Sequence, residues 1–198
     1  MKLNFLVGFA LLLAVAGCRT SATAKGDTIA SFQDLKPDAT IPEKASLAIG
    51  KIVMPVDITQ KFDGGDMKIE LEAHGQVLET EIYQIGPESF ALIEAAGEHY
   101  DEPLPLLKFP FSVGETWKWV GKMTAGQEPH KASASISTSQ EAIMLPSGST
   151  DTILVVVDLS IESGGPSPAN RKMRFWFAKD KGVVKRQFGD ASSREPAR

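Results

Sequence analysis

The stretch "DTILVVVDLSIES", residues 151–163, decides the fold because it carries the strongest β signal of the chain. It is rich in β-branched residues, which suit the pleated and half-buried surface of a sheet. Its apolar residues fall on every second position. One face of the predicted strand therefore holds Ile153, Val155, Val157, Leu159 and Ile161.

The same two-residue period recurs on both sides of that stretch. "MKIELEAH", residues 67–74, alternates without a break and predicts a half-buried strand. Further strand-like runs, separated by turns rich in Gly, Pro and Ser, are "SFALIEA", "TWKWVGKM", "KASASISTS", "RKMRFWFAKD" and "GVVKRQF". We therefore predict an all-β domain over residues 46–189. It is an antiparallel meander of about nine strands, curled into a barrel or half-barrel. A sandwich with crossed connections is the alternative.

The segments that flank this domain are polar. Residues 18–45 are small, polar and interrupted by prolines, which predicts a flexible tether. Within them, only Ser31 to Leu35 suggests a short helical turn. The ending "GDASSREPAR" predicts a frayed polar tail over residues 190–198.

The N-terminus has the pattern of a secretory signal helix. A basic start is followed by an apolar run of about a dozen residues, shorter than the roughly 20 that a transmembrane helix needs. The run ends in Val15-Ala16-Gly17-Cys18, which resembles the lipobox of bacterial lipoproteins. The resemblance implies that residues 1–17 are removed as a signal peptide and that Cys18 carries a diacylglycerol thioether. Its acyl chains would then hold the protein on a membrane.

Arg19 follows the cysteine, where an aspartate commonly retains enterobacterial lipoproteins in the inner membrane. The resemblance therefore implies delivery to the outer membrane, facing the periplasm, in an organism with two membranes.

Composition and motifs exclude several classes of function. A net charge of -4 argues against a nucleic-acid partner, which would favour a basic surface. Cys18 is the only cysteine, so once it is acylated no disulfide, thiolate cluster or cysteine nucleophile is available. The histidines His74, His99 and His130 are far apart and show no metal-ligand spacing. We predict no catalytic residues, no metal site and no cofactor.

One polar run could carry chemistry if the fold made its members converge. "EHYDEP" gathers Glu98, His99, Asp101 and Glu102. Acid–base or metal chemistry is conceivable there, although an ordinary polar loop is the favoured interpretation.

The aromatic residues supply a candidate ligand wall: Phe109, Phe111, Trp117, Trp119 and Trp176. Trp117 and Trp119 share one face of a predicted strand, with Lys118 on the other. Large aromatic side chains bury much apolar area, so a core role is the stronger interpretation and a ligand-binding wall the weaker one.

Three motifs occur in a familiar order: "LLKFPFSVGETWKW", "MLPSGSTDTILVVV" and "FWFAKDKGVVKRQF". Over about residues 105 to 188 they resemble elements of a broad group of bacterial exported proteins and lipoproteins of unknown function. The resemblance implies a curved antiparallel sheet, similar in style to the periplasmic lipoprotein-carrier family. It implies no catalytic residues.

These observations favour a non-enzymatic envelope lipoprotein whose sheet binds an apolar ligand or an envelope protein partner. A structural or assembly component of the envelope is the alternative, and a hydrolase of envelope polymers is a weaker third. The first hypothesis depends on whether the inside of the sheet is a cavity or is filled by side chains.

Overall fold

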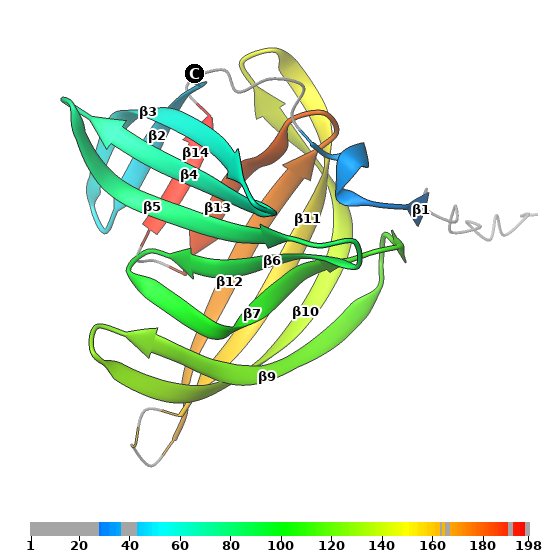
Figure 1. Ribbon diagram of the computed structural model, residues 1–198. Coiled ribbons are helices and arrows are strands. Elements are labelled where there is room, and N and C mark those ends of the chain that lie inside the picture. Colours follow the sequence, from blue (N-terminus) through cyan, green and yellow to red (C-terminus); the bar gives the residue numbers. More distant parts are fainter. Residues whose placement is uncertain (1–27, 37–42, 163, 165–166, 190–191, 197–198) are drawn as a thin grey trace, which may run out of the picture.

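The computed structural model describes residues 28–36, 43–162, 164, 167–189 and 192–196. The predicted signal peptide, the lipidation residue Cys18 and the first part of the predicted tether lie outside these residues. The described elements are β1 (Thr28–Ile29), η1 (Phe32–Asp34), β2 (Glu43–Ile49), β3 (Ile52–Asp63), β4 (Asp66–Ala73), β5 (Gln76–Ile85), β6 (Ser89–Ala95), β7 (Glu98–Lys108), β8 (Phe111–Ser112), β9 (Thr116–Ala125), β10 (Glu128–Leu145), β11 (Gly148–Ile161), β12 (Ala169–Ala178), β13 (Gly182–Phe188) and β14 (Ser192–Pro196) (Figure 1).

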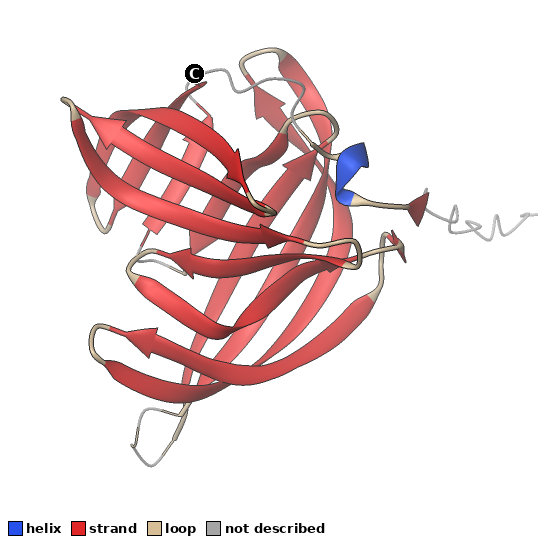
Figure 2. Ribbon diagram, in the orientation of Figure 1, coloured by secondary structure: helices blue, strands red, loops and turns tan. Residues whose placement is uncertain are grey.

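Twelve of these strands form one closed antiparallel barrel. From β2 to β7 and from β9 to β14, each strand pairs with the next along the chain, and β14 pairs with β2 to close the sheet. Strands account for most of the described chain (Figure 2). The predicted all-β meander barrel is confirmed, and the crossed connections of a sandwich are absent from the described part. The predicted number of about nine strands is too low.

The stretch that predicted the fold forms most of β11. Its alternating apolar set is buried, with Val155 and Val157 fully enclosed. In the long hairpin with β10, Val157 lies opposite Ile136. The alternating face of β4 is buried as well, with Met67, Ile69 and Leu71 at most 1% exposed. A strict two-residue period identified the core face correctly in both strands.

The tether prediction is wrong for its described part. Residues 28–36 form β1 and η1, and β2 already begins at Glu43. Ser31 caps η1 by accepting a hydrogen bond from the Gln33 amide (3.2 Å), as the suggested short turn required. Phe32 and Leu35 are each only 2% exposed, and the Phe32 ring stacks on Phe90 at 4.8 Å. Two apolar residues in a polar segment are therefore enough to dock it on the barrel.

The predicted polar tail is also wrong where the structure describes it. Ser192–Pro196 form β14, which pairs with β13 on one side and β2 on the other. The polar composition was misleading because Arg194, only 2% exposed, is buried in an ion-pair cluster.

The barrel has two ends, named here by what lies at each. The proximal end carries η1 and the turns at residues 64–65, 146–147 and 179–181; there Leu35 accepts a hydrogen bond from the Gly182 amide (2.8 Å). The distal end carries the turns at residues 50–51, 74–75, 96–97 and 126–127. Most of the distal turns lie on the left of Figure 1, and η1 lies on the right. No helix among the described residues is both long and apolar enough to cross a membrane.

Candidate functional site

The predicted ligand wall is divided between two places. Phe109, Phe111 and Trp119 are buried in the main core, and Trp117 packs against it half-buried. The Trp117 indole donates a hydrogen bond to the Pro105 carbonyl oxygen (2.8 Å). Trp176 instead belongs to a small cluster with Leu145, Ala178 and Val184. Four of the five aromatic residues therefore belong to the main core, and the fifth does not.

Side chains from opposite walls meet inside the barrel. Phe90 on β6 contacts Phe177 on β12 edge-to-face, with ring centroids 5.3 Å apart. Phe90 also stacks on Tyr83 of the neighbouring strand at 5.0 Å. The Tyr100 hydroxyl on β7 lies 3.6 Å from Met173 Sδ on β12. These contacts show that, along the part of the wall they span, the interior is a packed core.

A buried cluster of charges links β5 to β13 and β14. Glu81 is fully buried; its Oε1 lies 2.7 Å from Arg186 Nε and 3.1 Å from Arg194 Nε. The Nη2 atom of Arg186, which makes no well-aligned hydrogen bond, lies 2.5 Å from Glu79 Oε1. Two carboxylates therefore face two guanidinium groups, and the cluster balances its own charge.

The electrostatics of this cluster favour its charged state. Burial alone would raise the pKa of Glu81, but Arg194 and Arg186 overcome it and hold that pKa at about 2. Burial, and then the charge of Glu81, raise the pKa of Tyr83, which donates a hydrogen bond to Glu81 Oε2 (2.6 Å). Because these buried charges stay ionised and balance one another, the cluster has the properties of a structural link between β5 and the strands β13 and β14. In the sequence, the only signal of this cluster is that Glu79, Glu81 and Tyr83 fall on alternate positions and so share one face of a strand.

The polar run "EHYDEP" does not form a convergent site. It lies on β7, so its side chains alternate between the two faces of the strand. Glu98 is buried and paired with Arg171, whereas His99 and Asp101 are exposed on the other face. No group of three or more metal-ligating side chains occurs among the described residues. His74 is exposed in the turn after β4, apart from the other two histidines.

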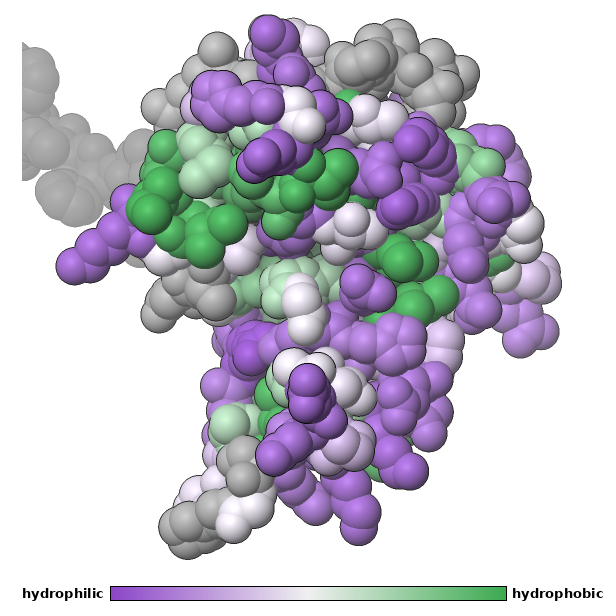
Figure 3. Space-filling view, turned by 60° about the vertical axis from the view of Figure 1, so that its left-hand side comes forward, coloured by the Kyte–Doolittle hydropathy of each residue, from purple (hydrophilic) through white to green (hydrophobic). Residues whose placement is uncertain are grey.

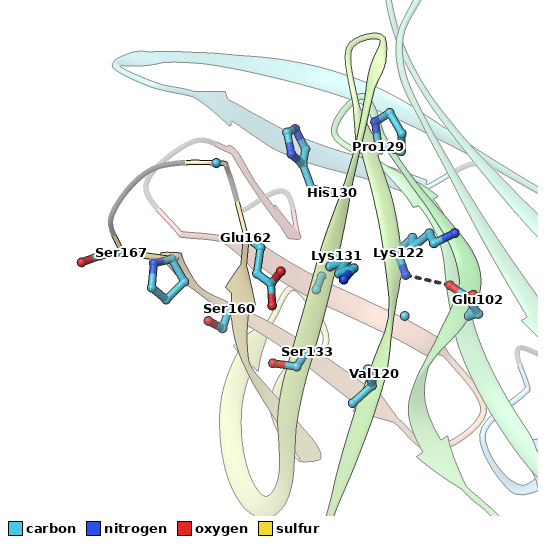
Figure 4. Close-up of a pocket in the computed structure, with 14 residues that line it drawn as sticks. Glu102, Val120, Lys122, Pro129, His130, Lys131, Ser133, Ser160, Glu162 and Ser167 are labelled. Carbon is cyan, nitrogen blue, oxygen red and sulfur yellow. Dashed lines mark hydrogen bonds between the residues drawn. The ribbon is translucent and has the colours of Figure 1, made fainter.

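One hollow of the described surface is a groove of about 950 Å³ at the distal end (Figure 4). It crosses the outer face of β9, β10 and the end of β11. Its lining includes Glu102, Val120, Lys122, Lys131, Ser133 and Glu162. Val120, Lys122, Lys131 and Ser133 are exposed, while their strand neighbours Trp119, Met123, Ala132 and Ala134 are buried. The groove is thus an outer surface, separate from the packed interior.

Gly121 shapes one side of this groove. A β-carbon at that position would lie 2.5 Å from Trp119 Cζ2 and 2.8 Å from Glu102 Oε2. Only glycine lets the indole and the carboxylate approach the backbone this closely. Glu102 Oε2 uses that space to accept a hydrogen bond from the Lys122 amide (2.7 Å), as Figure 4 shows.

The distal end also exposes large apolar side chains. They lie beside two hairpin turns: Ile49, Ile52 and Val53 at residues 50–51, and Val77 and Leu78 at residues 74–75. Ile52 and Val53 are the most exposed, at 63% and 68%. Figure 3 brings this side of the molecule forward and shows hydrophobic side chains gathered on its surface among polar ones.

Comparison with known proteins finds a likeness to solved structures alone. The chain matches no protein-family model and no curated protein. The hypothetical lipoprotein YmcC from Escherichia coli (K12) superposes with a TM-score of 0.47 and 10% identity, over 80% of this chain and 90% of that one. A putative lipoprotein from Parabacteroides distasonis superposes with a TM-score of 0.49 and 11% identity, over 84% of this chain and 97% of that one.

Proposed function

We propose that this chain is a lipid-anchored protein of the bacterial cell envelope that binds a partner protein through the outer surface of its barrel. The observation that carries the proposal is the contact between opposite walls, from Phe90 to Phe177 and from Tyr100 to Met173. An apolar ligand would have to displace these side chains, so the groove and the exposed distal turns are the better binding surfaces.

The position of the N-terminal segment supports an orientation on the membrane. Nine residues separate Cys18 from Thr28, and a chain of that length spans at most about 35 Å. Thr28 leads into η1 at the proximal end, so an anchor on Cys18 holds that end near the bilayer. The distal end, with its groove and apolar turns, then faces away from the membrane. That placement suits a protein partner better than the bilayer that holds the anchor.

The anchor is tested by mass spectrometry of the protein extracted from membranes. We expect a mature chain that begins at Cys18 and carries acyl chains, and we expect Cys18→Ser to move the protein out of the membrane fraction. Density-gradient separation of the two membranes tests the assignment to the outer membrane that Arg19 suggests. A water-soluble chain that retains residues 1–17 would contradict the anchor.

The choice of partner protein over apolar ligand is tested by native mass spectrometry of the barrel without its acyl chains. We expect the mass of the protein alone after purification from cells. A lipid that stays bound in stoichiometric amount would restore the apolar-ligand hypothesis. A catalytic role is tested separately by incubating the protein with envelope polymers, where we expect no turnover.

A further inference from the structure

The barrel is weakly joined between β7 and β9. Only three residue pairs connect these strands: Glu98 with Ala125, His99 with Thr124, and Tyr100 with Met123. Beyond them, toward the proximal end, no residue pair joins the two strands. We call the gap between residues 101–108 of β7 and residues 116–122 of β9 the seam.

Two prolines on β7 explain why the pairing stops. Pro105 turns its carbonyl oxygen toward β9, because that oxygen accepts the Trp117 indole N–H. The N–H and C=O of one strand residue point to the same side, so the N–H that Pro105 lacks would also have faced β9. Pro103, two residues earlier, has the same orientation. With both donors missing, β7 cannot continue the ladder with β9.

The facing edge of β9 therefore keeps unpaired backbone groups. The Lys122 amide points into the seam, where it bonds Glu102. Because the direction alternates along a strand, the N–H and C=O groups of Lys118 and Val120 point the same way. No residue pair with β7 reaches either of them. Val120 is 78% exposed and lines the groove, so the outer face of this strand is open to the surface.

The outer face beside the seam carries lysines in the groove that Glu102 and Glu162 also line. Lys122 on β9 lies directly opposite Lys131 on β10. Lys122 points its amide into the seam, so Lys122 and Lys131 form no backbone hydrogen bonds with each other. In antiparallel sheets, residue pairs of this non-hydrogen-bonded kind bring their side chains closest together. Like charges directly opposite are unfavourable. Among the described residues neither these two lysines nor Lys118 forms a salt bridge.

The indole N–H of Trp119 is a buried hydrogen-bond donor beside the seam. Trp119 is 8% exposed, and its Nε1 has no hydrogen-bond partner in the described structure. The Cε2 atom bonded to that nitrogen lies 3.0 Å from the β-carbon position of Gly121, next to the Glu102 carboxylate. An unpartnered buried N–H is costly, and a ligand that supplied an acceptor would remove the cost.

We infer that the seam receives an extended segment of a partner protein, which adds to β9 as a strand and presents acidic side chains to Lys118, Lys122 and Lys131. This inference rests on the proposed function and gives the binding mode. Main-chain hydrogen bonds to Lys118 and Val120 would hold the segment, and the lysines would select its charge. An open edge calls for a peptide backbone, because a lipid or polysaccharide offers no strand to continue the ladder.

The test places the photo-crosslinker benzoylphenylalanine at Ser133, which is exposed in the groove, in the full chain expressed in its own bacterium. We expect a crosslink to one contiguous acidic segment of one envelope protein. Val120→Pro removes the amide that points into the seam and leaves the ladder to β10 intact, so we expect the crosslink to fall about tenfold. Val120→Thr keeps that amide, and we expect it to leave the crosslink within about twofold of the original.

A second pair of variants tests charge without touching the backbone. Lys122→Glu combined with Lys131→Glu should lower the crosslink about tenfold, because it reverses the charge that selects the segment. Lys51→Glu, on the exposed turn after β2, is the matched control and should leave it unchanged. Thermal unfolding of each variant shows that the barrel is intact; should Val120→Pro fail to fold, the charge variants decide.

Each remaining outcome counts against the inference in a defined way. A crosslink that persists when Val120→Pro is folded overturns strand addition and leaves the proposed function standing. A crosslink only to lipid, to polysaccharide or to a second copy of this chain overturns the partner segment. The absence of any crosslink from Ser133 overturns both the seam as a binding site and the groove.

Discussion

Between β14 and β2, five residue pairs join the two ends of the sheet, and beside this junction Arg194 and Arg186 meet Glu81 in the core. Between β7 and β9 there are three pairs, and side chains such as Glu102 and Trp117 bond across the gap in place of a ladder. The first junction joins distant parts of the chain, and buried charges tie its strand β14 to β5. The second joins near neighbours and is kept open by prolines. The comparison shows that one barrel can be joined by a backbone ladder at one junction and largely by side-chain bonds at another.

Removing β14 should have the largest effect. A chain that ends at Gly189 loses both the closing strand and Arg194, and it leaves Glu81 buried with one fewer cation. Domains are stable by only about 5–15 kcal/mol, so we expect no cooperative unfolding transition. Circular dichroism during heating checks this. A truncated chain that melts within a few degrees of the full one would show that the tail is dispensable, as its composition suggested.

Glu81→Gln should be the most damaging single substitution in the cluster. It leaves Arg186 and Arg194 buried without their shared carboxylate, and breaking a buried pair in this way costs about 3–5 kcal/mol. Urea denaturation measures the change in the free energy of unfolding. Glu70→Gln is the control: Glu70 also pairs with two lysines, Lys61 and Lys68, but on an exposed face. An equal loss in both variants would contradict the role assigned to burial.

The cluster also predicts how stability depends on pH. The pKa of Glu81 is lowered in the folded state to about 2 from an ordinary value of 4.5. Its contribution is therefore fully present above pH 4.5 and is lost as the pH falls from 4.5 toward 2, by about 3 kcal/mol in all. The pKa of Glu70 is lowered as well, by its side-chain bond to Lys68 and then by Lys61. High salt screens that exposed group, so the measurement belongs in high salt.

Glu81→Gln separates the two contributions to the acid transition. In high salt the variant should lose most of the pH dependence between 4.5 and 2, because it has no carboxylate at position 81 to protonate. Urea denaturation at several pH values provides the data. A variant that keeps the full slope would assign the transition to other carboxylates.

Restoring backbone N–H donors on β7 at the seam should have the smallest effect on the free energy of unfolding. Its effect on hydrogen exchange in the facing strand should be clear. Replacing Pro103 and Pro105 with valine returns two amides that face β9, and each new hydrogen bond is worth about 1 kcal/mol. The gain is partly offset because proline restricts the unfolded chain. Hydrogen exchange at Val120 is the sharper measurement, and we expect it to slow about tenfold as the ladder extends. Unchanged exchange at Val120 would show that packing, and not the prolines, holds the seam open.

Much of the architecture could be predicted because strands with one buried face show it in their residue order. β11 and β4 reveal their inner faces through alternation, and both were identified correctly. β7 was overlooked because Pro103 and Pro105 read as loop residues, although they sit inside a strand whose pairing they limit. β14 was overlooked because its buried residues are a serine and an arginine, and Glu81, the partner of Arg194, lies more than 100 residues away.

The candidate site was less predictable than the fold. The aromatic residues drew attention as a ligand wall, yet most of them proved to be core, the stronger of the two interpretations. The groove depends on Val120, Lys122 and Lys131, which look ordinary in the sequence. Their significance comes from register, since only pairing places the two lysines opposite one another.

The sequence by itself determined the all-β meander and the core faces of its most regular strands, because a two-residue period is a local property of the chain. It also supplied the resemblance at residues 15–18 that predicts an anchor on Cys18. Only the tertiary structure decided that opposite walls touch, that Glu81 meets two arginines, and that β9 keeps an open edge. Those features depend on which distant strands become neighbours, and that is settled when the barrel closes.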